Sequence, residues 1–436
     1  MDRRTFLRKG LLGSVGLGAS LRSLGQGRRP VTLTFFYPVG VAGPLARIIE
    51  GYVREFEREH PDIRVTPVFG GSYAENQAKV LAAIKAGNPP DTAILLSTEL
   101  FTLLHLDAIE PFESLLVGDQ EGRALVEDIF PAFMANSMLD GKVWSIPFQR
   151  STPIMYYNKQ AFEEAGLDPE KPPQTWEELL EFGARLTKKD GSGRVVRWGV
   201  QIPEETWGIW MLEGLTIQAG GMLWDPNGRG CVVLFDSQYV ADSLRFLTEL
   251  KKRGASPPEI VRWSTTPNDF VAGRVAIMYH STGSLGFVRQ NARFPFGTAF
   301  QARKVRYGVP TGGANFYIFK GQDPVKRQAT WRFIKWMTRP EMVARWSIDS
   351  GYVATRRSAW DLPMMKEYVQ RVPQAVTARG QLAYAKPELS VYNRQEVHVV
   401  IERAMADVLL GSRALAEALR DGQAQINAVL TPFCRR

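Results

Sequence analysis

Strand-like and helix-like segments alternate near the start of the chain, and this alternation constrains the fold more than any other feature. Residues 31–36 (VTLTFF) alternate β-branched and apolar residues as a strand does. The same reading predicts a helix over 47–60, a strand over 63–68, a helix over 75–86 and a buried strand over 92–96. Strands that alternate with helices pair in parallel, so we expect an α/β fold with mainly parallel sheets.

Further elements follow without a long linker between them. A strand is predicted over 154–157, and Thr175 with Glu178 forms a capping-box pattern at the start of a helix over 176–186. Amphipathic helices are predicted over 237–253, 325–337 and 399–410. A chain of 436 residues exceeds the roughly 250–300 residues that one core supports. We therefore expect two domains between which the chain passes more than once.

Most of the positive charge lies at the N-terminus. Residues 1–29 contain seven basic residues and one acidic residue, so they contribute +6 of the net charge of +9. The other residues carry only +3, which gives little reason to expect a nucleic-acid partner.

The same N-terminal segment has the pattern of an export signal. Arg3 and Arg4 precede Thr-Phe-Leu and an uncharged stretch over 10–21, as in twin-arginine signals. That stretch is shorter than the about 20 residues a membrane span needs. We expect cleavage between Ala19 and Gly27 and a periplasmic or other extracytoplasmic location. The alternative is an amphipathic N-terminus that is not exported.

Motifs of common enzymes are missing from the sequence. There is no P-loop, no G-x-S-x-G elbow and no H-E-x-x-H zinc motif. The chain has four histidines, and its cysteines, Cys231 and Cys434, form no C-x-x-C pair, so we expect no metal and no cofactor. We expect a protein that is not an enzyme; a secreted hydrolase with a distant triad is the alternative from another class. Whether the two cysteines pair stays open.

Seven sequence blocks, in order, resemble one protein family. They are 86–91 (AGNPPD), 108–112 (AIEPF), 141–148 (GKVWSIPF), 152–159 (TPIMYYNK), 172–179 (PPQTWEEL), 270–278 (FVAGRVAIM) and 336–341 (WMTRPE). Together they resemble the extracellular solute-binding proteins of ABC importers, in the family that takes sugars and polyol phosphates. The resemblance covers about residues 30–430.

This resemblance implies a two-lobe fold of the type II periplasmic-binding-protein kind, with a multi-strand hinge. The first lobe is expected to hold 30–148 and 285–337, and the second 151–284 and 340–436. The ligand is expected in the cleft between the lobes, which close on it by a hinge motion. The implied partners are a small-molecule ligand and the transmembrane subunits of an ABC permease.

Short segments resemble members of the family that bind glycerol phosphates. They are 72–76 (SYAEN), 150–153 (RSTP), 282–285 (TGSL), 312–314 (GGA) and 350–352 (SGY). The resemblance implies glycerol 3-phosphate or a glycerophosphodiester as the ligand. A mono- or oligosaccharide is the alternative ligand.

The family's ligand contacts carry over to several positions of this sequence. They imply hydroxyl or backbone contacts from Tyr73, Ser151, Ser281, Gly313 and Tyr352. Trp207 and Trp210 lie three residues apart, on one face of a helix, and match aromatic positions that pack against the polyol. We expect Trp207 to face the ligand more than Trp210.

Two positions depart from the family's pattern. Ser97 stands where the family has Glu, and Glu99 can replace that carboxylate through a local shift. His398 stands where the family has Arg, the natural partner of a phosphate. Arg394 or Arg150 can supply the missing charge, unless both are ordinary surface arginines. If the phosphate contacts are lost, the saccharide alternative is favoured.

Overall fold

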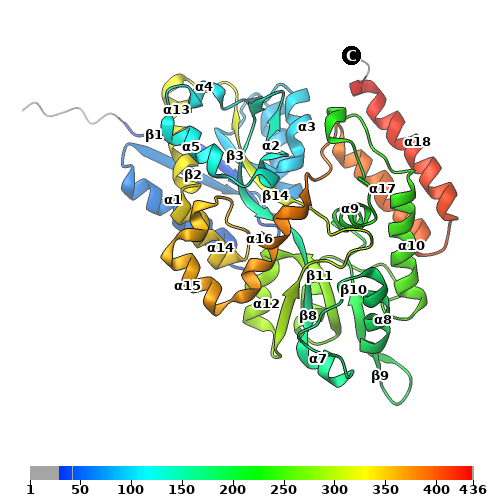
Figure 1. The fold of residues 1–436 in the computed structure, drawn as a ribbon. Coiled ribbons are helices and arrows are strands. Elements are labelled where there is room, and N and C mark those ends of the chain that lie inside the picture. The colour runs from blue at the N-terminus through cyan, green and yellow to red at the C-terminus, as the bar shows by residue number, and fades with distance from the viewer. Residues whose placement is uncertain (1–28, 42, 435–436) are drawn as a thin grey trace, which may run out of the picture.

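Two separate sheets, one in each of two lobes, form the framework of the molecule (Figure 1). The computed structural model describes residues 29–41 and 43–434. Residues 1–28, and with them the expected twin-arginine pair and cleavage region, lie outside the described residues.

The first sheet has six strands in the order β2-β1-β3-β14-β4, with β7 paired to β14 off this path. Strand β1 runs parallel to β2 and β3, whereas β14 runs antiparallel to β3, β4 and β7. The strands are β1 (Val31–Tyr37), β2 (Ile63–Phe69), β3 (Thr92–Leu96), β4 (Ile109–Glu110), β7 (Ile146–Ser151) and β14 (Gly312–Phe319).

The second sheet has the order β12-β8-β11-β10-β9. Only β10 and β11 pair in parallel here, so both sheets are mixed. The expected two-lobe α/β fold is confirmed, and every strand of the first sheet except β14 runs in one direction. The sheets are mixed because β8 and β14 enter their sheets from the opposite lobe and meet their neighbours from the other end. The strands are β8 (Pro153–Asn158), β9 (Lys188–Lys189), β10 (Val195–Gln201), β11 (Val275–Ser281) and β12 (Phe296–Ala299).

Two small ladders complete the strands. They join β5 (Met138–Leu139) to β6 (Lys142–Val143) and β13 (Val309–Pro310) to β15 (Ala385–Lys386).

Helices cover both sheets (Figure 1). In chain order they are α1 (Leu45–Glu59), α2 (Tyr73–Lys85), α3 (Leu100–His105), α4 (Glu113–Leu116), α5 (Gln120–Asp128), α6 (Pro131–Met134), α7 (Lys159–Glu164), α8 (Trp176–Leu186), α9 (Gly208–Gln218), α10 (Gln238–Lys252), α11 (Thr266–Val271), α12 (Leu285–Asn291), α13 (Pro324–Met337), α14 (Pro340–Ser350), α15 (Pro363–Arg371), α16 (Val376–Gln381), α17 (Arg394–Leu409) and α18 (Leu415–Cys434).

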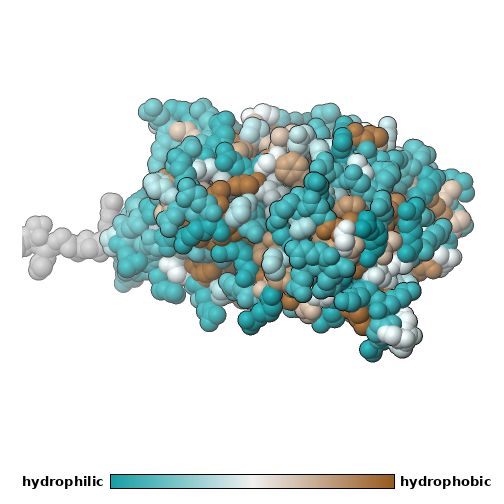
Figure 2. Space-filling model, turned by 60° about the horizontal axis from the view of Figure 1, so that its bottom comes forward, coloured by the Kyte–Doolittle hydropathy of each residue, from teal (hydrophilic) through white to brown (hydrophobic). Residues whose placement is uncertain are grey.

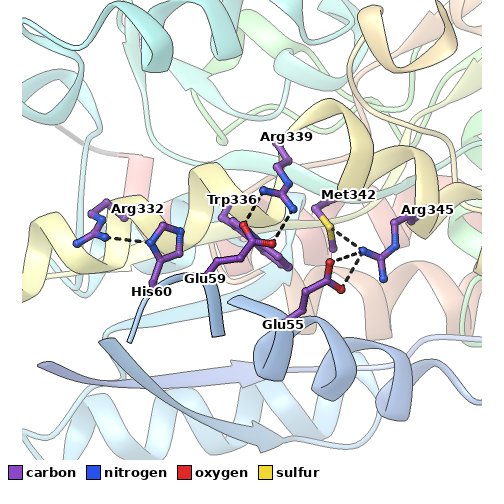
Figure 3. Close-up of polar contacts among 8 residues, drawn as sticks. All are labelled: Glu55, Glu59, His60, Arg332, Trp336, Arg339, Met342 and Arg345. Carbon is purple, nitrogen blue, oxygen red and sulfur yellow. Dashed lines mark hydrogen bonds and ion pairs between the residues drawn. The ribbon is translucent and has the colours of Figure 1, made fainter. Parts of the chain in front are cut away.

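Two segments differ from the expected lobe boundaries. Strand β12 pairs with β8 in the second sheet, although residues 285–337 were expected in the first lobe. Helix α14 packs beside α1 and α13 of the first lobe, although residues 340–436 were expected in the second (Figure 3). The physical reason for the second difference is Trp346 of α14, which is fully buried and stacks on Phe148 of β7 at 5.4 Å.

A disulfide joins Cys231 to Cys434 and so ties the end of α18 to the loop before α10. This settles the pairing that the sequence leaves open. The face seen in Figure 2 is mostly hydrophilic, with apolar side chains in small scattered patches. None of the described helices combines the length and apolarity that crossing a membrane requires.

Candidate ligand-binding site

A cavity with a free volume of about 30 Å³ lies where the two lobes meet. Seven of the twelve expected site residues line it, namely Tyr73, Ser151, Trp207, Trp210, Ser281, Gly313 and Tyr352. This free volume is room for about two water molecules, so the closed lobes have to move apart before a solute enters.

Strand ends bring hydroxyl and backbone groups to this cavity. Ser151 is the last residue of β7, Ser281 is the last residue of β11, and Gly313 is the second residue of β14. Gly313 has φ +98°, and a Cβ there would lie 1.9 Å from the Gln149 carbonyl oxygen. Only glycine fits this position, because any side chain would collide with the backbone of the neighbouring strand β7.

Two tyrosines form a hydrogen-bonded pair in the cavity wall. The Tyr73 hydroxyl lies 3.1 Å from the Tyr352 hydroxyl and 3.1 Å from Gln149 Oε1. Tyr73 begins α2, whose N-terminus is fixed by a capping box from Ser72 and Glu75. Burial raises the pKa of Tyr73 well above its usual range and that of Tyr352 to about 12. Both hydroxyls therefore stay protonated and can donate hydrogen bonds at neutral pH.

Three tryptophans form the aromatic part of the wall. Trp207 directly precedes α9 and follows Thr206, whose φ of +59° is unusual for a β-branched residue. Trp210 donates from Nε1 to the Thr311 carbonyl oxygen at 3.0 Å. The rings of Trp207 and Trp210 lie 6.1 and 6.2 Å from that of Trp263. Both expected tryptophans therefore reach the cavity, and Trp263 joins them.

An aromatic contact crosses between the lobes. Tyr73 of the first lobe meets Trp207 of the second edge to face, with ring centroids 6.0 Å apart. The lobes are therefore closed around the cavity in this structure. Such rings offer a flat apolar surface to the C–H face of a polyol at low entropic cost.

Glu388 is the acidic side chain of the wall. It lies after β15 and is only 3% exposed. Burial is the main reason why its pKa rises to about 7, and the nearby Arg394 and Arg150 act against that rise. Among the described residues that line the cavity there is no Lys, Arg or His.

Ser97 and Glu99 do not line the cavity. Both are buried in a short 3-10 turn after β3, and Glu99 pairs with Arg394 across the lobes at 3.3 Å. Burial raises the pKa of Glu99, although Arg394 acts in the opposite direction. In this closed arrangement Glu99 does not shift into the cavity wall, because Arg394 and Gln77 hold its carboxylate elsewhere.

Neither expected arginine reaches the cavity. Arg150 is fully buried and donates to Asn315 Oδ1 at 3.2 Å and to Thr311 Oγ1 at 3.1 Å. Side chains alternate along a strand, so Arg150 points away from the face that Ser151 presents. Arg394 is engaged by Glu99. The two arginines are therefore buried rather than surface residues, and they do not replace the expected phosphate partner in this closed arrangement.

His398 lies one helical turn after Arg394 in α17 and does not line the cavity. Its Nε2 is buried and has no hydrogen-bond partner among the described residues. Burial lowers the pKa of its imidazole well below the usual range, so the ring is neutral.

Gly312, in the same short segment as Gly313, also lines the wall, and five further wall residues were not expected to form the site, namely Gly40, Val41, Leu96, Trp263 and Glu388. Trp263 and Glu388 lie in loops that carry no periodic pattern, so only the tertiary fold places them. Gly40 has a detectable constraint, because a Cβ there would lie 2.0 Å from the Tyr73 ring. Within residues 29–41 and 43–434, no group of His, Cys, Asp and Glu is arranged to hold a metal ion.

Comparisons with known proteins identify a family for this arrangement. Residues 51–373 match the family described as "Bacterial extracellular solute-binding protein". The chain is 27% identical over 432 residues to the sn-glycerol-3-phosphate-binding periplasmic protein UgpB of Escherichia coli K12, with 96% of each chain covered.

Solved structures share the fold. UgpB from Mycobacterium tuberculosis, in complex with glycerophosphocholine, gives a TM-score of 0.79 at 24% identity, with 93% of this chain and all of that chain covered. The cyclic α-maltosyl-1,6-maltose binding protein of Arthrobacter globiformis gives 0.77 at 22% identity, covering 92% of this chain and all of that one.

Proposed function

The chain belongs to the bacterial extracellular solute-binding protein family, and on this premise we propose that it captures a glycerol phosphate compound outside the cytoplasmic membrane. The ligand is glycerol 3-phosphate or a glycerophosphodiester. The lobes close on the ligand, and the closed protein delivers it to the transmembrane subunits of an ABC permease.

One observation carries this proposal. The two lobes enclose a cavity whose wall combines aromatic rings, serine hydroxyls and a glycine backbone, drawn from segments far apart in the sequence. A ligand bound there touches both lobes and stabilises the closed form. The names of the two UgpB relatives support a glycerol phosphate ligand.

A saccharide is the second candidate ligand, and the composition of the wall favours it. The described lining holds three tryptophans and a carboxylate but no basic side chain. A phosphate is usually bound by charge-assisted hydrogen bonds from arginine or lysine, whereas a sugar uses stacking and neutral hydrogen bonds. The Arthrobacter relative, named as a maltosyl-maltose binding protein, supports this alternative.

The test is a thermal-shift panel with glycerol 3-phosphate, glycerophosphocholine, maltose, trehalose, glucose and free phosphate. A ligand at 100 times its Kd adds about 2.7 kcal/mol of stability, which gives a clear shift. We expect a shift with phosphate esters; a shift with sugars alone favours the second candidate.

We propose binding without chemistry at this site. Analysis of the solute after incubation tests this point. A bound compound that is recovered unchanged supports a binding protein, whereas turnover that disappears in Glu388→Gln would favour the secreted hydrolase.

A further inference from the structure

Among the described residues, no contact gives the carboxyl group of Glu388 a role in stabilising the fold. Its side chain lines the cavity and is 97% buried, given its exposed fraction of 3%. Within the described part of the chain, Oε2 has no hydrogen-bond partner. A buried acceptor without a donor costs stability, so its retention points to a donor that arrives from outside the protein.

The backbone around Glu388 is held firmly, which fixes the position of the carboxyl group. The Glu388 N–H donates to Asn136 Oδ1, and Asn136 Nδ2 donates to the Glu388 carbonyl oxygen, both at 2.9 Å. The next N–H, that of Leu389, donates to Glu213 Oε1 at 2.6 Å, and Ser390 Oγ donates to the Thr98 carbonyl oxygen at 3.1 Å. A functional group on such a rigid segment is preorganised for a ligand.

The nearby arginines make their hydrogen bonds to other groups, and the buried Nε of each has no partner among the described residues. Arg394 pairs with Glu99 at 3.3 Å, and Arg150 donates to Thr311 and Asn315. Both still lower the pKa of Glu388 through space, while burial raises it and Glu99 adds to that rise. Glu388 therefore faces the cavity as an acceptor that no cation of the described chain neutralises by direct contact.

We propose that Glu388 is a specificity-determining residue, which accepts a hydrogen bond from a hydroxyl group of the solute and disfavours phosphate monoester dianions. The proposal rests on the proposed function, because it assumes that a solute binds in this cavity. It narrows the ligand to a polyhydroxyl compound that is neutral, or whose phosphate is a diester with a single charge held away from Glu388.

Electrostatics gives the physical reason for this selectivity. With a pKa of about 7, Glu388 is ionised in about half of the molecules at pH 7, and the ionised carboxylate repels an anion strongly in a cavity of low dielectric; a dianion feels this repulsion twice over. A hydroxyl donor instead forms a charge-assisted hydrogen bond, which is stronger than a neutral one. The same residue thus attracts one ligand class and repels the other.

The test uses isothermal titration of the wild type, Glu388→Gln and Glu396→Gln with glycerol 3-phosphate, glycerophosphocholine and maltose. Glu396 is exposed in the first turn of α17, so its substitution removes the same charge without touching the cavity. We expect Glu388→Gln to raise the affinity for glycerol 3-phosphate relative to the better of the other two probes by at least tenfold. Glu396→Gln should leave that ratio unchanged.

Each other outcome has a definite meaning. If glycerol 3-phosphate or glycerophosphocholine binds the wild type but Glu388→Gln changes the ratio by less than threefold, the inference about Glu388 is overturned and the proposed function stands. If none of the three probes binds the wild type, both the proposed function and this inference are overturned. If Glu388→Gln shows no cooperative melting transition, the carboxyl group is needed by the fold, which also overturns the inference. A Glu388→Asp variant, which keeps the charge, should retain the wild-type order of affinities.

Discussion

Two regions of the molecule differ in whether their carboxylates are paired. They are the outer face built by α1, α13 and α14, and the cavity between the lobes. On the outer face, acids and arginines are matched: Glu59 accepts from Arg339 at 3.0 Å and Glu55 from Arg345 at 2.9 Å (Figure 3). In the cavity wall, Glu388 is buried and its Oε2 lacks a partner among the described residues.

This difference separates charged side chains that pair on the surface from a charged side chain that faces the ligand cavity. Exposed ion pairs contribute little each, because water screens them and their side chains lose entropy. A buried charge without a partner costs stability, so a sequence that keeps one is expected to use it. The predictions below test both halves of this comparison.

The largest effect is expected where a buried pair loses one partner. Arg394→Ala leaves Glu99 buried without its cation, which costs about 3–5 kcal/mol in the free energy of unfolding. Urea denaturation measures this loss. Arg339→Ala is the matched control, since its pair with Glu59 is 34% and 41% exposed and should cost less than about 1 kcal/mol. Equal losses in the two variants would remove the distinction between the two regions.

The contribution of Glu388 to the stability of the protein should fall as the pH rises from about 5 to 8. The pKa of Glu388 is raised from its ordinary 4.5 to about 7, so between these values the native state binds more protons than the unfolded chain. The loss is complete above pH 7 and is on the order of 3 kcal/mol. Burial also raises the pKa values of Glu99 and Glu213, which act in the same direction. Burial lowers the pKa values of His280 and His398, which act in the opposite direction below about pH 6.5.

Urea denaturation at pH 5 and pH 8 checks this pH dependence in the wild type and in Glu388→Gln. The variant should lose less stability than the wild type across this range, because its side chain does not titrate. The same loss in both proteins would show that Glu388 is not the group responsible.

Trp207→Ala should weaken solute binding by about thirtyfold, or about 2 kcal/mol, because it removes an aromatic face of the cavity. Titration with glycerophosphocholine and with maltose measures the change. Trp144→Ala is the matched control, since Trp144 is also half-buried but does not line the cavity. Wild-type affinity in Trp207→Ala would place the ligand elsewhere.

The smallest effect is expected on the outer face itself. Glu55→Gln removes the charge partner of Arg345, and we expect a cost of about 0.5 kcal/mol that shrinks further in high salt. Urea denaturation at low and high ionic strength measures it. A cost above 2 kcal/mol would show that these surface pairs do stabilise the fold.

The sequence predicts the elements that have a clear local signal. Strand β3 occupies Thr92–Leu96 as expected, and α8 occupies Trp176–Leu186 with the expected capping box from Thr175 and Glu178. The sequence does not predict helix α9, because all of Gly208–Gln218 is buried and shows no amphipathic pattern. Helix α17 begins at Arg394, earlier than the expected residue 399.

Some residues of the cavity wall can likewise be predicted from short sequence segments, whereas others are placed only by the tertiary fold. Tyr73, Ser151 and Tyr352 lie in short segments whose sequence resembles the family, so their place in the wall can be foreseen. Trp263 and Glu388 lie in loops, where the fold alone decides what faces the cavity. The role expected of Arg150 and Arg394 fails for a related reason, because strand alternation and a buried partner direct them elsewhere.

A crystal structure of the protein with glycerophosphocholine tests the central claim most directly. We predict density for the solute in the interlobe cavity, between Tyr73, Trp207 and Trp263, with a solute hydroxyl within hydrogen-bond distance of the Glu388 carboxylate. A solute bound outside this cavity, or a cavity that holds only water in crystals grown with saturating glycerophosphocholine, would contradict the account.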